Sequence, residues 1–275
     1  MGYLGKDIRL NRLFSSRSGK MVTIMFDHTI ARGIQDGLIP IRKKIAEAAL
    51  ARPSAMTMHK GIAESCFAEH AGKGISLILK ASSPCPYYPA YAASTADVEE
   101  AVQYGADAIA IGCIFGGADQ PRGVENVARF VKEAHRWGMP VIGHFYPNGE
   151  QIPRENREDW RNVAYAARAG AELGVDVLKV HHSGDPDEFA RIVEAVPARV
   201  VLAGGSHHGT DIAEYLRMTR NVIDAGAAGV AYGRFVWEYK HPAALITAVK
   251  AIVHDNASVK EALEIMKEFE QRNCC

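Results

Sequence analysis

A single lysine interrupts an apolar run in the second half of the chain. Lys179 stands between Leu178 and Val180 in the stretch DVLKVHHSGD, residues 176–185. A lysine in such surroundings either extends its long stem to solvent at a strand end or stays partly neutral, so that its amine can attack a carbonyl carbon. The second interpretation predicts Schiff-base chemistry at Lys179.

That chemistry needs two further groups. Protons move when a carbinolamine forms, when it loses water and when a carbon–carbon bond breaks, so a weak acid or base and a carboxylate must lie beside the lysine. Tyr146 and Asp27 each follow an apolar run, VIGHF and VTIMF respectively, and we expect them to supply these groups. Desolvation and nearby positive charge favour a neutral amine, and Lys80 and Arg234 are candidates for that charge.

The elements that position these residues repeat along the chain. Short runs rich in Val, Ile and Met are each followed by turn residues and a helical pattern, at the spacing of one strand, one loop and one helix. Eight such units predict an α/β fold of the (β/α)8 TIM barrel type, as a single domain over 1–275 with an extra C-terminal helix at 257–271. The strands are expected at 21–27, 54–59, 75–81, 107–114, 140–146, 175–181, 198–204 and 228–233.

Helical spacing of apolar residues is clearest at 122–137, 156–173, 211–225 and 242–253. A doubly wound sheet shares the alternation of strands and helices. It usually carries a glycine-rich dinucleotide fingerprint after its first strand, whereas FDHTIARG follows here. The barrel is therefore the favoured architecture.

In such a barrel the C-terminal ends of all strands meet at one mouth, so the residues that close the strands predict the site. Strand alternation turns Lys179 inward above Val177, while Leu178 and Val180 face the helices. The same alternation places Asp27 and Tyr146 on the inward faces of their strands. His144 lies on the same face as Tyr146. Seven of the 11 histidines close strands, namely His28, His59, His144, His181, His182, His207 and His208.

The ends of the last two strands indicate an anion site. LAGGS and YGRF offer unhindered backbone N–H groups and one guanidinium, and barrel enzymes often bind phosphate after strands seven and eight. We therefore expect a phosphorylated small-molecule substrate, although such glycines also form plain tight turns. The residues expected to bind it are Gly204, Gly205, Ser206, Gly233 and Arg234, with His28, His144 and His181 lining the same mouth.

Composition restricts the partners. Lys+Arg and Asp+Glu balance at 32 each, so no global field attracts nucleic acid or an anionic membrane. The N-terminal stretch lacks the apolar core of a signal peptide and no apolar run reaches membrane-spanning length, so we expect a cytoplasmic protein. The five cysteines show no C-x-x-C spacing, which argues against a disulfide framework or a zinc site.

The chain resembles the archaeal-type class I aldolases, a (β/α)8 family that includes fructose-1,6-bisphosphate aldolase, an aminodideoxyheptulosonate synthase and the thiolase of a phosphorylated autoinducer. The similarity runs from RLNRLFSSRSGKMVTIMFDH through WGMPVIGHFYPNGE, AAELGVDVLKVHHSGDP and VVLAGGS to VIDAGAAGVAYGRFVWEYKHPAALITAVKAIVH. It implies that Lys179 forms the Schiff base, Tyr146 transfers protons and Asp27 is the carboxylate. It also implies phosphate-binding loops at the glycines and Arg234, no metal or cofactor, and a homo-oligomer, as a pentamer or decamer ring.

The chain departs from the family pattern around the mouth. Thr29 stands where the family usually has glycine, His181 and His182 follow the lysine in place of Thr and Tyr, and Ser206 follows the double glycine where lysine is frequent. The altered lining argues against fructose bisphosphate itself as the substrate of this otherwise fructose-bisphosphate-aldolase-like site. Tyr146, which the thiolase branch lacks, favours aldol chemistry.

Several functions remain open at this point. A Schiff-base aldolase acting on a phosphorylated ketose or related keto compound is the first hypothesis, with a transaldolase-like synthase or a thiolase as alternatives. The histidines suggest a metal-dependent lyase or hydrolase, but the His-x-His motif is absent from the first strand and adjacent histidines alternate faces. A phosphosugar-binding protein on a retired enzyme scaffold would not need Lys179, Tyr146 and Asp27.

Overall fold

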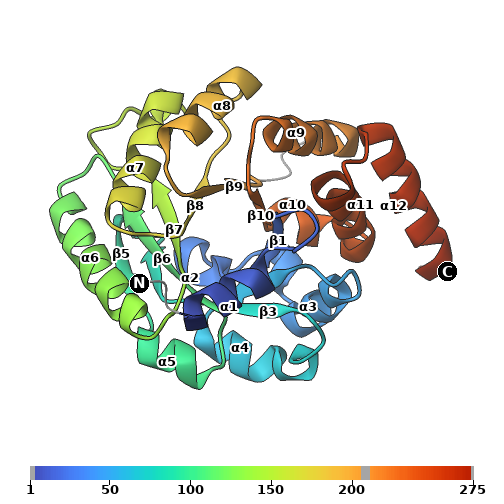
Figure 1. Ribbon diagram of the computed structural model, residues 1–275, viewed down its shortest axis with the longest axis horizontal. Coiled ribbons are helices and arrows are strands. Elements are labelled where there is room, and N and C mark those ends of the chain that lie inside the picture. The colour runs from blue at the N-terminus through green and yellow to red at the C-terminus, as the bar shows by residue number, and fades with distance from the viewer. Residues whose placement is uncertain (1–3, 206–210, 274–275) are drawn as a thin grey trace.

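The computed structural model describes residues 4–205 and 211–273, in which eight parallel strands close into a barrel inside a layer of helices (Figure 1). The ring order is β1-β10-β9-β8-β7-β6-β3-β2, and β1 closes it by pairing with β2. The predicted (β/α)8 barrel is confirmed. Its strands are β1 (Met21–Met25), β2 (Ala55–Met58), β3 (Ser76–Lys80), β6 (Ala108–Ile114), β7 (Val141–Tyr146), β8 (Val177–Val180), β9 (Arg199–Ala203) and β10 (Gly229–Tyr232).

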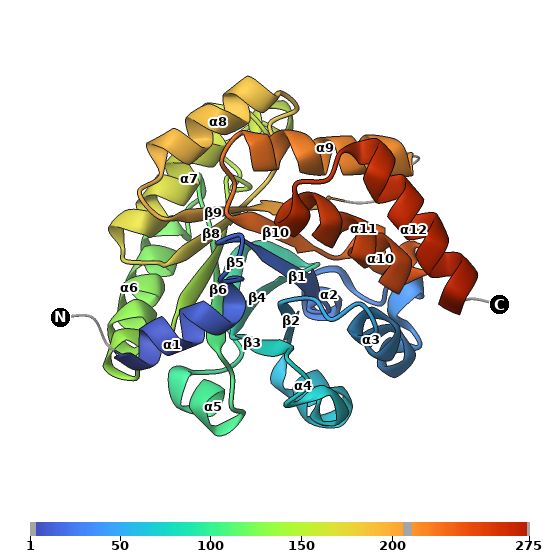
Figure 2. The ribbon, with the colours of Figure 1, turned by 45° about the vertical axis from the view of Figure 1, so that its right-hand side comes forward.

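Helices cover the outside of this ring, and the extra C-terminal helix lies beside its predecessor (Figure 2). The longer helices are α1 (Leu4–Leu13), α3 (Ile41–Ala49), α4 (Lys60–Cys66), α5 (Val98–Gln103), α6 (Gln120–Arg136), α7 (Trp160–Glu172), α8 (Pro186–Ala195), α9 (Ile212–Asp224), α11 (Pro242–Asp255) and α12 (Val259–Asn273). Short turns lie in the loops, namely α2 (His28–Arg32), α10 (Arg234–Glu238), η1 (Asp36–Leu38), η2 (Ala68–His70) and η3 (Arg154–Asn156). Among the described residues, no helix is long and apolar enough to cross a membrane.

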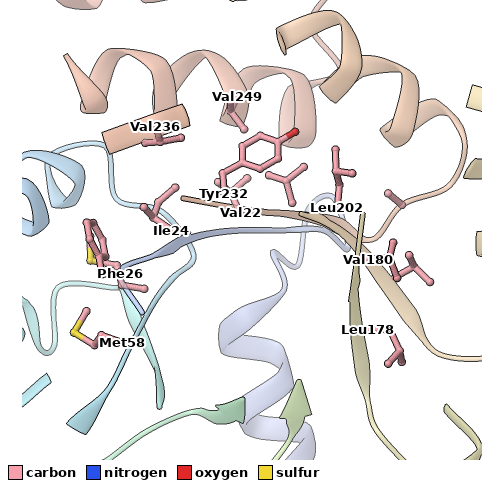
Figure 3. Close-up of a cluster of buried hydrophobic side chains, with 14 of the residues drawn as sticks. Val22, Ile24, Phe26, Met58, Leu178, Val180, Leu202, Tyr232, Val236 and Val249 are labelled. Atoms are coloured by element: carbon pink, nitrogen blue, oxygen red, sulfur yellow. The ribbon is translucent and has the colours of Figure 1, made fainter. Parts of the chain in front are cut away.

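Strand alternation divides the core into two layers. Outward residues, among them Val22, Ile24, Leu178 and Val180, pack between the barrel and the helices (Figure 3). Inward residues such as Val177 fill the barrel together with the end of α1. Lys179 therefore lies on the inward face above Val177, as the sequence predicts.

Two helix-to-strand joints define where the functional strands begin. Gly174 and Gly226 follow α7 and α9 with φ angles of 89° and 94°, a region where other residues are strained. The turn at Gly174 leads into β8, which carries Lys179. The turn at Gly226 leads into β10, after which Arg234 stands.

Two elements were not predicted from the sequence. Helix α1 precedes the first strand, and its end places Leu13 and Phe14 among the inward residues of the barrel. An antiparallel hairpin of β4 (Ser82–Cys85) and β5 (Tyr88–Ser94) follows β3, and β4 packs against α2. The hairpin therefore stands at the end of the barrel where the strands finish, beside α2.

Candidate active site

Lys179 and Tyr146 occupy neighbouring strands. Lys179 of β8 is partly buried and in register with His144 of β7, so these two side chains stand side by side on the inward face. Tyr146 lies two residues further along that face of β7. Its ring stacks on His181, with ring centroids 4.4 Å apart and an interplanar angle of 21°. The predicted amine and proton-transfer group thus meet at one part of the mouth.

Asp27 follows β1 and is only 9 % exposed. Burial alone would raise the pKa of this carboxyl group, but the facing groups His28, Lys179 and Lys80 lower it. Near neutral pH the two lysines lower the pKa of Asp27, because His28, with a pKa of about 4, is uncharged there. The mouth therefore holds one buried carboxylate among positive charges.

The histidines around this carboxylate are uncharged. Burial, assisted by the charge of Lys179, lowers the pKa of His28 and of His181 to about 4, and burial with the charge of Lys80 lowers the pKa of His144 well below its ordinary value. Nδ1 of His28 is 3.6 Å from one oxygen of Asp27 and Nδ1 of His144 is 3.9 Å from the other. Since both rings are neutral, these contacts are not ion pairs. The rings are available to donate or accept hydrogen bonds.

Lys80 ends β3 and is 5 % exposed. Its Nζ lies 3.0 Å from Nδ1 of His144, across the intervening strand β6, whose inward residues in register with these two are Ala110 and Gly112. These small residues leave room for the lysine stem. Burial lowers the pKa of Lys80 to about 8, with Asp27 opposing this shift and Lys179 adding to it. At pH 7 the ammonium therefore donates to Nδ1 of His144.

The β10 side of the mouth is cationic. Arg234 is partly buried, and burial followed by the charge of Arg32 in α2 lowers its pKa. A Cβ atom at Gly233 would lie 2.5 Å from the ring of His28, so glycine lets His28 pack there. The ring of His28 also meets Trp237 edge to face, with centroids 5.5 Å apart.

The double glycine after β9 has a packing role as well. A Cβ atom at Gly204 would lie 2.5 Å from the hydroxyl of Tyr215 and from the ring of Tyr232. Gly205 has a φ of 65°, and among the described residues no heavy atom lies within 4 Å of where its Cβ would stand. Ser206, also expected to bind phosphate, lies outside the described residues, as do His207 and His208.

The sequence profile of the DeoC/LacD family aldolases matches residues 21–239. The chain belongs to this family. Among its relatives, 2-amino-3,7-dideoxy-D-threo-hept-6-ulosonate synthase of Halobacterium salinarum is 35 % identical to this chain over 259 residues. The alignment covers 94 % of this chain and 95 % of the relative. A class 1 fructose-bisphosphate aldolase of the same organism is 34 % identical over 257 residues. That alignment covers 90 % of this chain and 95 % of the relative.

A solved structure supports the same family. An archaeal fructose-1,6-bisphosphate aldolase with its catalytic lysine covalently bound to the carbinolamine intermediate of the substrate matches this aldolase with a TM-score of 0.81 and 28 % identity, over 90 % of this chain and 99 % of that one. The resemblance to the archaeal class I aldolases is thereby confirmed. The chain is a member of a class I, Schiff-base-forming group of aldolases.

Some strand-end residues of this aldolase do not face the mouth. Nδ1 of His182 accepts a hydrogen bond of 2.8 Å from the backbone N–H of Gly184, and its ring stacks on Phe189 of α8. Lys60 pairs with Glu100 at 2.5 Å. Within residues 4–205 and 211–273, no group of three or more His, Cys, Asp or Glu side chains is placed to hold a metal ion.

Sequence reasoning missed two features of this site. It named Lys80 only as a source of charge and did not anticipate its contact with His144, which depends on how the barrel closes. It also did not name Arg32. The available signal was its position four residues after His28 in DHTIAR, which places both on one short helix at the mouth.

Proposed function

We propose that this chain is a class I aldolase that makes or breaks a carbon–carbon bond in a phosphorylated ketose or related keto compound through a Schiff base on Lys179. The observation that carries the proposal is the inward position of Lys179, in register with His144, in the mouth that Asp27 and Tyr146 also close. The names of the two Halobacterium relatives support this substrate class. A synthase with another acceptor uses the same steps.

The first half of the reaction forms the Schiff base. The amine of Lys179, once it has lost its proton, attacks the carbonyl carbon of the ketone, and the resulting carbinolamine loses water to give an iminium ion. Tyr146 carries a proton from the attacking nitrogen to the oxygen and then donates its own proton to the hydroxyl, which departs as water and leaves a phenolate. The Asp27 carboxylate orients the substrate hydroxyls and stabilises the positive iminium nitrogen.

The second half breaks the carbon–carbon bond. Tyr146 accepts the proton of the hydroxyl on the carbon beyond that bond, and the bonding electron pair moves toward the iminium nitrogen, which leaves an enamine and releases an aldehyde. The enamine is then protonated on carbon. Water hydrolyses the iminium ion, which frees the ketone and Lys179. Synthesis follows the same steps in reverse.

Reductive trapping tests this function. Borohydride converts the iminium ion formed with dihydroxyacetone phosphate into a stable secondary amine. We expect the mass of one reduced donor on the peptide that carries Lys179. An unmodified Lys179 under turnover conditions would reject the proposal. Turnover that persists after exhaustive chelation separates this chemistry from a metal-dependent lyase.

Lys80 acts here as a positioning residue that holds His144 and Asp27 in their working protonation states. We expect Lys80→Met to lower kcat at least about tenfold while making the protein more stable at pH 7. The pKa of Lys80 falls from 10.5 to about 8 on folding, so the buried ammonium destabilises the fold by on the order of 3 kcal/mol at pH 7.

The change in the free energy of unfolding with pH shows whether the buried ammonium of Lys80 destabilises the fold. Between pH 8 and pH 10.5 the unfolded chain binds the Lys80 proton and the folded chain does not, so the free energy of unfolding rises with pH in the native protein. This rise is absent in Lys80→Met. Urea unfolding at pH 7 and at pH 10 measures it for both proteins. A variant that is less stable at pH 7 would contradict the assignment.

Arg234 is proposed to bind the donor phosphate, together with Gly204, Gly205, Ser206 and Gly233. Arg234→Met removes a charge-assisted, two-point contact, so we expect the half-saturating concentration of dihydroxyacetone phosphate in the trapping reaction to rise about 10- to 100-fold. Arg168→Met is the control, because Arg168 pairs with Glu172 on the outer helix α7. Equal effects of the two variants would disprove the phosphate site.

The family resemblance and the composition support two further proposals about the whole molecule. These are a homo-oligomeric ring of five or ten subunits and a cytoplasmic location. His28, His144 and His181 are proposed to contact the substrate hydroxyls. Their neutral rings can serve as donors or acceptors.

A further inference from the structure

An apolar cavity opens at the side of the mouth opposite to Lys179. Around the ring, three strands separate β8 from β2 in either direction, so the ends of these two strands face each other across the mouth. A cavity of about 680 Å³ lies beside the ends of β1 and β2 and contacts Asp27 and His59. Asp27, which is proposed to act in catalysis, is one of its lining residues, so the cavity adjoins the proposed active site.

The walls of this cavity are mainly aliphatic. They come from α2, the segment that follows it and the start of α4. Ile34 and Ile39 are 74 % and 68 % exposed, and clustered exposed aliphatic side chains mark binding sites. Lys60 also lines the cavity, but its ammonium is paired with Glu100. The aliphatic lining residues are Ile30, Ile34, Leu38, Ile39, Ile41 and Ile62.

Helix α2 separates this cavity from the cationic side of the mouth. Ile30 lines the cavity, whereas Arg32, two residues further on, lies on another face of the helix. Besides burial, the charge of Arg32 lowers the pKa of His181 and of Arg234, so Arg32 lies toward β8 and β10. The two faces of α2 therefore differ in chemistry, with a guanidinium group toward β8 and β10 and an isoleucine toward the cavity.

We propose that the cavity binds an apolar substituent on the aldehyde half of the substrate. The enzyme then joins a phosphorylated ketone to an aldehyde that carries an aliphatic chain or an aryl ring, or splits the product of that addition. This inference rests on the proposed function. A ketone bound to Lys179 with its phosphate toward Arg234 leaves the side of the mouth beside Asp27 and His59 to the aldehyde half, and the cavity lies at that side. The cavity volume lies in the range of about 300 to 1,000 Å³ typical of small-molecule sites.

A second phosphate would bind poorly in this cavity. An anion placed among isoleucines loses hydration without gaining a charged partner, because the ammonium of Lys60 already pairs with Glu100. The His59 ring contributes one polar atom, since its Nδ1 lies 3.3 Å from the hydroxyl of Thr95 and its Nε2 has no hydrogen-bond partner among the described residues. A neutral aldehyde needs no more than this.

A series of acceptors tests the inference. Aldol addition is measured with dihydroxyacetone phosphate as donor and with straight-chain aldehydes from propanal to octanal, benzaldehyde and glyceraldehyde 3-phosphate as acceptors. We expect kcat/KM to rise about two- to fourfold for each added methylene group until the cavity is filled, and hexanal to exceed glyceraldehyde 3-phosphate. A flat series, or a preference for the phosphorylated aldehyde, would overturn the inference.

Trapping on the unaltered protein separates the two proposals. Borohydride reduction of the adduct between Lys179 and dihydroxyacetone phosphate requires no aldehyde. A trapped adduct with a flat acceptor series rejects the apolar site and leaves the proposed function intact. Absence of the adduct rejects the proposed function and this inference with it.

A matched pair of variants locates the binding site. Ile34→Asp changes an exposed side chain of the cavity, so we expect the ratio of kcat/KM for hexanal over propanal to fall about five- to tenfold. Leu50→Asp is the control, since Leu50 is 68 % exposed and lies outside the cavity lining. If Ile34→Asp instead dissociates an oligomer in sedimentation experiments and leaves this ratio unchanged, the cavity is an interface between copies and the inference is wrong.

Discussion

Lys179→Met is expected to lower kcat/KM for aldol addition by at least about 10⁴-fold, because loss of a covalent nucleophile leaves only the contribution of substrate binding. Methionine keeps most of the length and apolar character of the lysine stem, so the packing above Val177 is retained. The borohydride adduct with dihydroxyacetone phosphate should disappear together with turnover. Intact-protein mass spectrometry and initial rates measure the two effects.

Lys250→Met is the matched control for this substitution. Lys250 is a partly buried lysine of α11 whose Nζ donates hydrogen bonds of 2.6 Å and 2.8 Å to the backbone oxygens of Ala51 and Arg52, away from the mouth. We expect it to keep both turnover and the adduct. An adduct that moves to Lys80 in Lys179→Met would assign the nucleophile to the second lysine. Unchanged turnover would end the Schiff-base proposal.

The orientation of the catalytic strands could be predicted from the sequence because it depends on a local rule. Leu178 and Val180, on either side of Lys179, are apolar and therefore face the layer of helices. Strand alternation then turns Lys179 inward. The structure confirms this, since both neighbours belong to the outer core and Val177 to the inner one. The closure of eight parallel strands then brings Asp27 and Tyr146 to the same mouth.

The contact between Lys80 and His144 could not be predicted, because it is not local. It requires β3 and β7 to lie on either side of β6 and requires the small inward residues Ala110 and Gly112 between them. Neither requirement is visible in the apolar pattern of a single strand. Sequence alone places Lys80 at the rim and leaves its partner unknown.

The hairpin and the apolar cavity were missed for a related reason. The segment 82–94 contains three prolines and little alternation of apolar residues, so it has no strand signal. The cavity walls come from α2, η1 and the start of α4, which are separate in the chain. Exposed isoleucines such as Ile34 look unremarkable in a sequence and become informative only when their neighbours in space are known.

Tyr146→Phe removes the phenol that is proposed to move protons in both halves of the reaction. We expect kcat to fall about 10²- to 10⁴-fold, which is the usual contribution of one general acid or base, because phenylalanine cannot accept the hydroxyl proton when the carbon–carbon bond breaks. The ring can still stack on His181, so the wall of the mouth is retained. The borohydride adduct on Lys179 should form more slowly, because the phenol also protonates the departing hydroxyl, but it should still accumulate with dihydroxyacetone phosphate although turnover is lost.

Tyr165→Phe removes the same hydroxyl outside the mouth and serves as the control. Tyr165 is 50 % exposed, and its hydroxyl accepts a hydrogen bond of 2.8 Å from Gln120, so we expect turnover within about twofold of the native rate. If Tyr146→Phe retained more than a tenth of the native kcat, the proton would have to pass through another group near the Lys179 amine. His144 and Asp27, whose pKa values the charge of Lys179 lowers, are candidates for that group. Loss of turnover in Tyr146→Phe with the adduct present would show that cleavage requires the phenol.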